Sequence, residues 1–316
     1  MKNLITAAVA ALGIATSAVS ATAADWTPPG PIKLMIAFAA GGGADTQARL
    51  IAEEMEARTG WQFIPEQVTG KGGVNLLVEM KDMPNDGSVI GMVVTESFGY
   101  NLYSAKTGMK PSEFTGLTTT AGFQMGVVAQ TSKGWSSFED VVAAAKAGEQ
   151  LRFGVMSPRL SDLAYLLGKA QGVEFNIVSV KGGKAVMNGV NAGDMDLGFM
   201  AGIQSKGVAA GDLVNLASAL SGPLVQTPDA PTFADLGVAY DSDGYFMFAA
   251  PAGMPEDARA ALTDAIVSIV SDPETKAGGL IAKAFGGPSI IKGADLDALM
   301  AKGFDESEGL IKAASE

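Results

Sequence analysis

The sequence predicts an α/β fold with two lobes, each a mostly parallel sheet flanked by helices, with a ligand cleft between them. Short apolar runs alternate with amphipathic helical segments, which is the pattern of strand–helix–strand units joined by right-handed crossovers. The pattern starts a second time after Ala121, with no flexible linker between the halves. We therefore expect the chain to cross between the lobes more than once, through its strands.

The first 24 residues are predicted to form a signal peptide. Lys2 is a positive start, Leu4 to Val19 is apolar, and Ala21-Thr22-Ala23 offers the small side chains that a signal peptidase reads. The apolar run is shorter than the roughly 20 residues of a membrane span. A buried N-terminal helix is the alternative, but such a helix rarely lacks a polar face over this length. We expect export to the periplasm.

The first half of the mature chain contains three predicted strands and two predicted helices. Ala48, Ile51, Ala52 and Met55 repeat at the spacing of one buried helix face. Asn85-Asp86-Gly87 is a turn signal before the third strand. The predicted strands are 32–38, 62–68 and 89–94, and the predicted helices are 44–59 and 73–81.

The second half repeats this alternation. Ser136 with Glu139 fits a capping box and predicts the start of a helix. The predicted strands are 125–130, 151–155, 175–180, 196–200 and 214–219, and the predicted helices are 136–147, 160–170 and 185–191. The extended run 245–250 then returns to the first lobe, and two or three helices follow Pro255. We therefore assign 25–124 plus 246–316 to lobe 1 and 125–245 to lobe 2.

Composition removes several classes of function. The chain has no Cys and no His, which excludes Cys/His nucleophilic sites, zinc sites with such ligands and His general bases. The formal net charge of −12 argues against nucleic acid and anionic membrane surfaces as partners. We expect no cofactor, no metal and a monomer.

A glycine-rich segment, Phe38 to Asp45 (FAAGGGAD), lies between the first strand and the first helix. Glycines let the backbone approach a ligand closely, and the N–H groups of a helix start suit an anion. The dinucleotide fingerprint does not fit, because Thr46 stands where its last glycine is needed. A tight turn without a ligand explains this segment equally well by itself. The candidate ligand-binding residues here are Phe38, Ala40, Gly41, Gly42, Gly43 and Asp45.

Asp45 has three readings. It can stabilise the positive start of the helix, hold the glycine loop, or accept a hydrogen bond from an amine or hydroxyl of the ligand.

A second glycine loop, Thr69 to Asn75 (TGKGGVN), occupies the same kind of position after the second strand. In a parallel sheet both loops fall at the carboxyl ends of their strands, where open α/β sheets bind ligands. Two helix starts aimed into one crevice predict a site for a small carboxylate. The candidates are Gly72 and Gly73, with the hydroxyls of Thr95 and Ser97 after the third strand.

Equivalent strand-to-helix positions in the second half supply further candidates: Ser157, Arg159, Ser161 and Lys181. Arg159 would form a bidentate pair with a carboxylate, and Lys181 would act as a point charge. The alternative for either cation is a solvated surface charge. Asp196 is a candidate as well, with a role in a turn as its alternative.

These motifs resemble, in order and spacing, the solute-binding subunits of tripartite tricarboxylate transporters, also called Bug proteins. The segments that carry the resemblance are Phe38–Asp45 with Ala48-Arg49, Gly70–Gly73, Pro84–Gly87, Asn101–Tyr103, Lys181–Gly183, Gly193–Asp196, Pro228–Thr232 and Ala250–Pro255. The resemblance implies a two-lobed periplasmic binding protein of type II. It also implies that both glycine loops hold one ligand carboxylate through backbone groups and waters, while the second lobe selects the rest.

Two segments depart from the family pattern. Gly154 to Ala164 lacks the usual Gly-Ser-rich, His-containing stretch and brings in Arg159, and Val180 stands where an aromatic residue is common. Both departures fall in the predicted second lobe, which leaves the ligand open among dicarboxylates, tricarboxylates, aromatic acids and acidic amino acids.

The resemblance implies capture of an organic acid by hinge closure and its delivery to membrane subunits of a transporter. Net acidity does not exclude an anionic ligand, because surface charges are screened beyond about 8 Å at physiological salt. A sensor partner of a signalling receptor is an alternative that the sequence does not separate from transport. An enzyme on the same fold would use Asp45 or Tyr165 as acid or base. Without His, Cys or paired carboxylates, we predict that the protein is not an enzyme.

Overall fold

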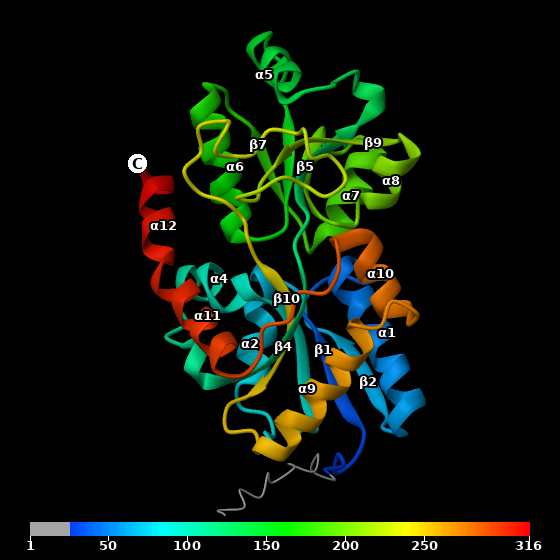
Figure 1. The fold of residues 1–316 in the computed structure, drawn as a ribbon. Coiled ribbons are helices and arrows are strands. Elements are labelled where there is room, and N and C mark those ends of the chain that lie inside the picture. Colours follow the sequence, from blue (N-terminus) through cyan, green and yellow to red (C-terminus); the bar gives the residue numbers. More distant parts are fainter. Residues whose placement is uncertain (1–25) are drawn as a thin grey trace, which may run out of the picture.

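The computed structural model describes residues 26–316, so the predicted signal peptide lies outside the described residues. Two lobes are stacked in Figure 1, each with its own five-stranded sheet and flanking helices. The predicted α/β class with two lobes is confirmed. None of the helices between residues 26 and 316 combines the length and the apolar character that a membrane span requires.

The sheet of the first lobe has the strand order β2-β1-β3-β10-β4. β1 pairs in parallel with β2 and β3, whereas β10 runs antiparallel to β3 and β4. The carboxyl ends of β1 and β3 therefore lie at one edge of the sheet. The strands are β1 (Ile32–Ile36), β2 (Phe63–Gln67), β3 (Val89–Val94), β4 (Phe114–Gly122) and β10 (Tyr245–Pro251).

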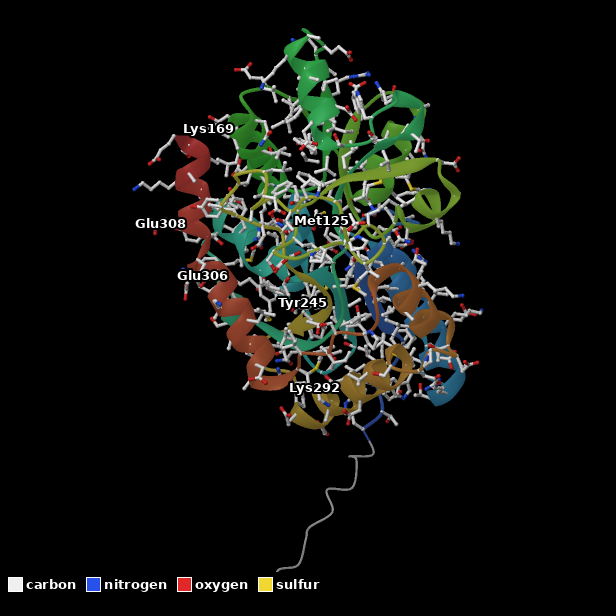
Figure 2. The ribbon with its side chains drawn as sticks, turned by 45° about the horizontal axis from the view of Figure 1, so that its top comes forward. Met125, Lys169, Tyr245, Lys292, Glu306 and Glu308 are labelled. Atoms are coloured by element: carbon white, nitrogen blue, oxygen red, sulfur yellow. The ribbon has the colours of Figure 1, made fainter. Side chains whose placement is uncertain are left out.

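The sheet of the second lobe has the order β7-β6-β8-β5-β9. β6 pairs in parallel with β7 and β8, and β5 is antiparallel to β8 and β9. The strands are β5 (Met125–Gln130), β6 (Arg152–Val155), β7 (Asn176–Ser179), β8 (Leu197–Ala201) and β9 (Leu213–Ser218). The chain passes from the first sheet to the second at Met125 and returns at Tyr245, and Figure 2 labels both residues near the middle of the molecule.

The helices cover the faces of the two sheets (Figure 1). Those of the first lobe are α1 (Gly43–Thr59), α2 (Val74–Met80), α3 (Thr95–Phe98), α4 (Tyr100–Ser104), α9 (Glu256–Val270), α10 (Lys276–Phe285) and α11 (Gly293–Asp305). Those of the second lobe are α5 (Phe138–Lys146), α6 (Pro158–Gln171), α7 (Gly183–Ala192) and α8 (Ser205–Ala210). Short 3-10 turns are η1 (Lys71–Gly73), η2 (Pro111–Glu113) and η3 (Thr131–Lys133).

The last helix, α12 (Ser307–Ser315), contacts both lobes. It packs against α4 of the first lobe and α6 of the second. Figure 1 shows it running along one side of the molecule, past the level at which the two lobes meet. Four helices thus follow Pro255 where the sequence predicts two or three, and the last of them is not confined to the first lobe.

The sequence did not predict β4, whose segment FTGLTTTAG mixes threonine with glycine instead of forming an apolar run. Thr118, Thr119 and Thr120 are nevertheless fully buried. Their hydroxyls find partners inside the protein: Thr119 Oγ1 donates to the Ser289 carbonyl at 2.5 Å and Thr120 Oγ1 to Gln47 Oε1 at 2.7 Å. A buried hydroxyl with a partner avoids the cost of desolvation, so a polar strand is tolerated in the core.

Smaller differences concern helix starts. α5 begins at Phe138, with Ser137 as its cap and Asp140 completing the capping box, one residue later than predicted from Ser136 and Glu139. The Asp140 carboxylate accepts the backbone N–H groups of both Ser136 and Ser137, at 2.8 and 3.0 Å. The short helices α3, α4 and α8 had no counterpart in the sequence prediction.

Candidate functional site

A cavity lies between the two lobes and contains about 550 Å³ of space, within the usual range for small-molecule sites. Its walls follow the carboxyl ends of four parallel strands, β1 and β3 in one sheet and β6 and β8 in the other. This is where open α/β sheets bind ligands. The lining residues are Phe38, Gly42, Gly43, Ala44, Val94, Glu96, Asn101, Phe123, Met125, Met156, Ser157, Leu160, Gly183, Ala201, Ile203 and Phe246.

The first glycine loop delivers the start of α1 to this cavity. Gly41 has φ 73°, a conformation that glycine adopts without strain, and Gly42 is the N-cap of the 17-residue helix. The N–H groups of Gly43 and Ala44 donate to no acceptor within residues 26–316, and both residues line the cavity. Two free donors at the positive end of a long helix therefore face the cavity.

Asp45 holds this loop from behind and does not line the cavity. Its carboxylate is buried and accepts hydrogen bonds from the Gly41 N–H at 2.8 Å, Arg49 Nε at 2.8 Å and Gln67 Nε2 at 2.6 Å. Of the three readings that the sequence allowed, the structure fits the one in which Asp45 supports the glycine loop. Ala40 is exposed and does not line the cavity.

The second lobe brings another helix start, that of α7, to the same cavity. Gly183, its first residue, lines the cavity, and its N–H donates to no acceptor in the described part of the chain. The two glycine turns also touch, since the Ala39 N–H donates to the Lys181 carbonyl at 3.3 Å. A Cβ placed on Gly42 would lie 3.9 Å from the Cβ of Lys184. One helix start from each lobe thus meets the other across the cavity.

The second glycine loop lines a neighbouring pocket instead. Gly72 lies there with Lys71 and Lys181, while Phe38 and Met156 line both pockets and stand between them. The structure therefore does not bring the two glycine loops of the first lobe into one crevice, as the sequence predicted. The large side chain of Phe38 occupies the space between them.

Ser97 and Asn101 fix the second loop to the first lobe. Ser97 Oγ donates to the Gly72 carbonyl at 2.8 Å and Asn101 Nδ2 to the same oxygen at 3.2 Å. A Cβ on Gly73 would fall 2.3 Å from Ser97 Oγ, so only glycine fits there. Thr95 Oγ1 accepts the Tyr245 N–H at 3.0 Å. These hydroxyls are used by the protein itself and do not line the cavity.

Glu96, between Thr95 and Ser97, is the one charged side chain among the described residues that line the cavity. It is 4 % exposed, accepts a hydrogen bond from Ser242 Oγ at 3.0 Å and lies 3.8 Å from Arg159 Nη1. Burial raises the pKa of Glu96, with Arg159 and the Ser242 hydroxyl acting in the opposite direction. The sequence analysis considered only the hydroxyls of this turn and missed its carboxylate.

Arg159 does not line the cavity, in contrast to the prediction that it binds the ligand directly. Its Nη2 donates to the Asp241 carbonyl at 2.7 Å, its backbone N–H donates to Asn101 Oδ1 at 3.4 Å, and its Nε is buried without a partner in residues 26–316. The guanidinium thus faces protein groups at the lobe boundary. Beside it, the Tyr100 hydroxyl of α4 donates to the Asp162 carboxylate of α6.

Three other predicted residues have local roles. Ser157 lines the cavity and caps α6, its Oγ accepting the Leu160 N–H at 3.3 Å. Ser161 lies one turn further along α6 and does not line the cavity. Lys181 is exposed and lines the neighbouring pocket.

Asp196 lies at the amino end of β8, away from Ala201, the end of that strand that lines the cavity. Its carboxylate binds Lys133 Nζ at 2.5 Å and Arg152 Nε at 3.0 Å. Burial alone would raise the pKa of Asp196, but these donors outweigh it and hold the pKa at about 2. We therefore leave Asp196 out of the site. No cluster of three or more metal-ligating side chains occurs in residues 26–316.

A family described as "Tripartite tricarboxylate transporter family receptor" matches residues 47–313. A Cupriavidus necator protein described as a UPF0065 protein in the gbd 5′ region is 28 % identical over 255 residues, which cover 79 % of this chain and 77 % of that protein.

Two solved structures share the fold. The chain superposes on R. palustris Rpa4515 with adipate at a TM-score of 0.80, with 21 % identity, covering 92 % of this chain and 99 % of that one. MatC from Rhodopseudomonas palustris with bound malate gives a TM-score of 0.77 and 18 % identity, covering 90 % of this chain and 100 % of that one. At these identities the likeness shows a common fold.

Proposed function

The chain belongs to the tripartite tricarboxylate transporter receptor family, and from this premise we propose that it is a periplasmic solute-binding protein. It captures a small organic carboxylate between its lobes and delivers it to the membrane subunits of a transporter, acting as a monomer. Capture consists of closure of the lobes over the ligand.

One observation carries this proposal: free backbone N–H groups from both lobes line a single cavity. Gly43 and Ala44 at the start of α1 face it from the first lobe and Gly183 at the start of α7 from the second. Each helix start acts as roughly half a positive charge, and a buried anion there gains about 1–2 kcal/mol per helix. A carboxylate between the two starts would link the lobes, so binding and closure would be coupled.

The site also gives no support to catalysis. The lining residues contain no Cys, His, Lys or Tyr, and Glu96 is the one acid or base among them. Tyr165, the other catalytic alternative from the sequence, is 43 % exposed and does not line the cavity. The adipate and malate bound to proteins of the same fold support a carboxylate as the ligand.

Thermal shift with a panel of organic acids tests the proposal. A ligand at a hundred times its dissociation constant stabilises the folded protein by about 2.7 kcal/mol. Gly42→Val should abolish the shift, because its Cβ would lie 3.1 Å from the Ala39 carbonyl oxygen and would push the loop out of position. Gly30→Val is the matched control, since a Cβ there meets nothing within 4 Å. If no acid raises the melting temperature of the wild-type protein, the proposal is wrong.

A further inference from the structure

The polar groups of the cavity are concentrated at its helix starts, and the rest of the wall is apolar. Eight lining side chains besides alanine and glycine are aromatic, aliphatic or methionine: Phe38, Val94, Phe123, Met125, Met156, Leu160, Ile203 and Phe246. The rings of Phe123 and Phe246 pack edge to face with centroids 5.1 Å apart. A ligand body in contact with this wall gives up its hydration without new hydrogen bonds, which favours an apolar body.

The remaining polar side chains of the wall are already engaged. Asn101 donates through Nδ2 to the Gly72 carbonyl and accepts the Arg159 N–H through Oδ1. Ser157 Oγ accepts the Leu160 N–H as a helix cap. No Lys or Arg is among the described lining residues. A second carboxylate at this wall would therefore lose its water shell and find almost no donor in exchange.

Glu96 adds a charge of the wrong sign for a second carboxylate. Its neighbour Arg159 is no compensation, because that guanidinium is outside the cavity and also faces Asp241, with 3.9 Å between Nη2 and the Asp241 carboxylate. In the ionised form Glu96 repels an anion across a low-dielectric space, and in the protonated form it still brings no positive charge. Lys71 and Lys181 line the neighbouring pocket, on the other side of Phe38 and Met156.

We infer that this cavity selects a monocarboxylate with an apolar body and discriminates against di- and tricarboxylates. The inference rests on the proposed function, because it takes the helix starts of α1 and α7 as the carboxylate site. Adipate and malate, the acids bound to the two structures described above, each carry two carboxylates. The structure thus separates the ligand of this chain from theirs by one charged group.

Calorimetric titration with acid pairs of equal carbon number tests the inference on the wild-type protein. Hexanoate and adipate, and 4-methylbenzoate and terephthalate, differ within each pair by one carboxylate in place of a methyl group. We expect the monoacid of a binding pair to bind at least tenfold more tightly than its diacid at pH 7.5. A diacid that binds as tightly as its monoacid overturns the inference while leaving carboxylate capture intact. If no acid of either kind binds, capture itself fails.

A variant pair identifies the cause of the discrimination. Glu96→Gln keeps the size and the hydrogen-bonding capacity of the side chain and removes its charge, so the ratio of monoacid to diacid affinity should fall by at least threefold. Glu139→Gln, an exposed residue on α5, is the matched control and should leave the ratio unchanged. An undiminished ratio in Glu96→Gln, with circular dichroism matching the wild-type protein, would contradict the role of Glu96.

Discussion

Glu96 of the first lobe faces Arg159 of the second, with 3.8 Å between Oε1 and Nη1, at the edge of the inter-lobe cavity. The carboxylate is 4 % exposed, while the guanidinium is 22 % exposed. At this distance the pair is an electrostatic contact without a close hydrogen bond, so the burial of Glu96 is only partly compensated. The relationship therefore links lobe closure to the charge on one carboxylate.

Glu96→Gln should stabilise the protein increasingly as the pH rises. The folded-state pKa of Glu96 is raised above its ordinary value of 4.5, so the folded protein holds this proton more tightly than the unfolded chain. The favourable contribution of the protonated group is complete below pH 4.5 and is lost as the pH rises through the raised pKa. Melting temperatures of wild type and variant between pH 4 and 8 measure this. A difference that does not change with pH would contradict it.

Asp196→Asn should weaken the protein at neutral pH and reduce its sensitivity to acid. The folded-state pKa of about 2 lies below the ordinary 3.8, so Asp196 contributes stability above pH 3.8 that disappears as the pH falls through about 2. Its partners Arg152 and Lys133 are 40 % and 33 % exposed, and allowing for solvent screening we expect a loss of about 1–2 kcal/mol.

Denaturant unfolding of Asp196→Asn at pH 7 and at pH 2 measures the change in free energy of unfolding. Ligand affinity in the same variant should equal that of the wild-type protein, because Asp196 lies away from the cavity. A tenfold loss of affinity would return Asp196 to the site.

Asp45→Ala should lower ligand affinity more than its effect on stability explains. The substitution removes the acceptor of the Gly41 N–H and of Gln67 Nε2, which costs roughly 1–3 kcal/mol of stability and frees the glycine loop. We expect the affinity for the bound acid to fall at least tenfold. Asp140→Ala is the control, because it breaks the capping box of α5 at a cost of about 1 kcal/mol without touching the cavity. Equal affinities in the two variants would refute the loop-holding role.

Tyr100→Phe should shift the protein towards an open form. The hydroxyl of Tyr100 on α4 donates to Asp162 on α6, and its removal leaves a half-buried carboxylate, whose pKa burial raises, without that partner in the closed state. The radius of gyration without ligand should increase, and affinity should fall a few-fold because closure then costs more. Small-angle scattering and calorimetry measure both. Tyr165→Phe is the control, since this exposed tyrosine lies on α6 away from the cavity.

The sequence predicted most of the strands because their apolar runs are continuous, as in β3, where all six residues are buried. β4 escaped prediction because its burial depends on partners such as Gln47 and Ser289, which are distant in sequence. Tertiary hydrogen bonds, which no local pattern records, decide whether a threonine-rich segment belongs in a core.

The site was predicted in part for a similar reason. Gly42, Gly43, Phe38 and Ser157 were found because strand-to-helix turns fall at one sheet edge, and all four line the cavity. Gly183 was missed beside Lys181, because which residue of a turn faces the ligand depends on how the opposite lobe docks. Arg159 and Asp196 attracted attention as charges, yet both are bound by other protein groups.

The position of α12 has a consequence for the route by which a ligand enters. This helix packs on α4 below and α6 above, so a lobe movement that preserves its contacts must pivot along that flank. The gap then widens on the opposite flank, where the turn at Gly42 meets Lys184. The molecule would open like a book whose spine is its own C-terminal helix, admitting its ligand from the fore-edge.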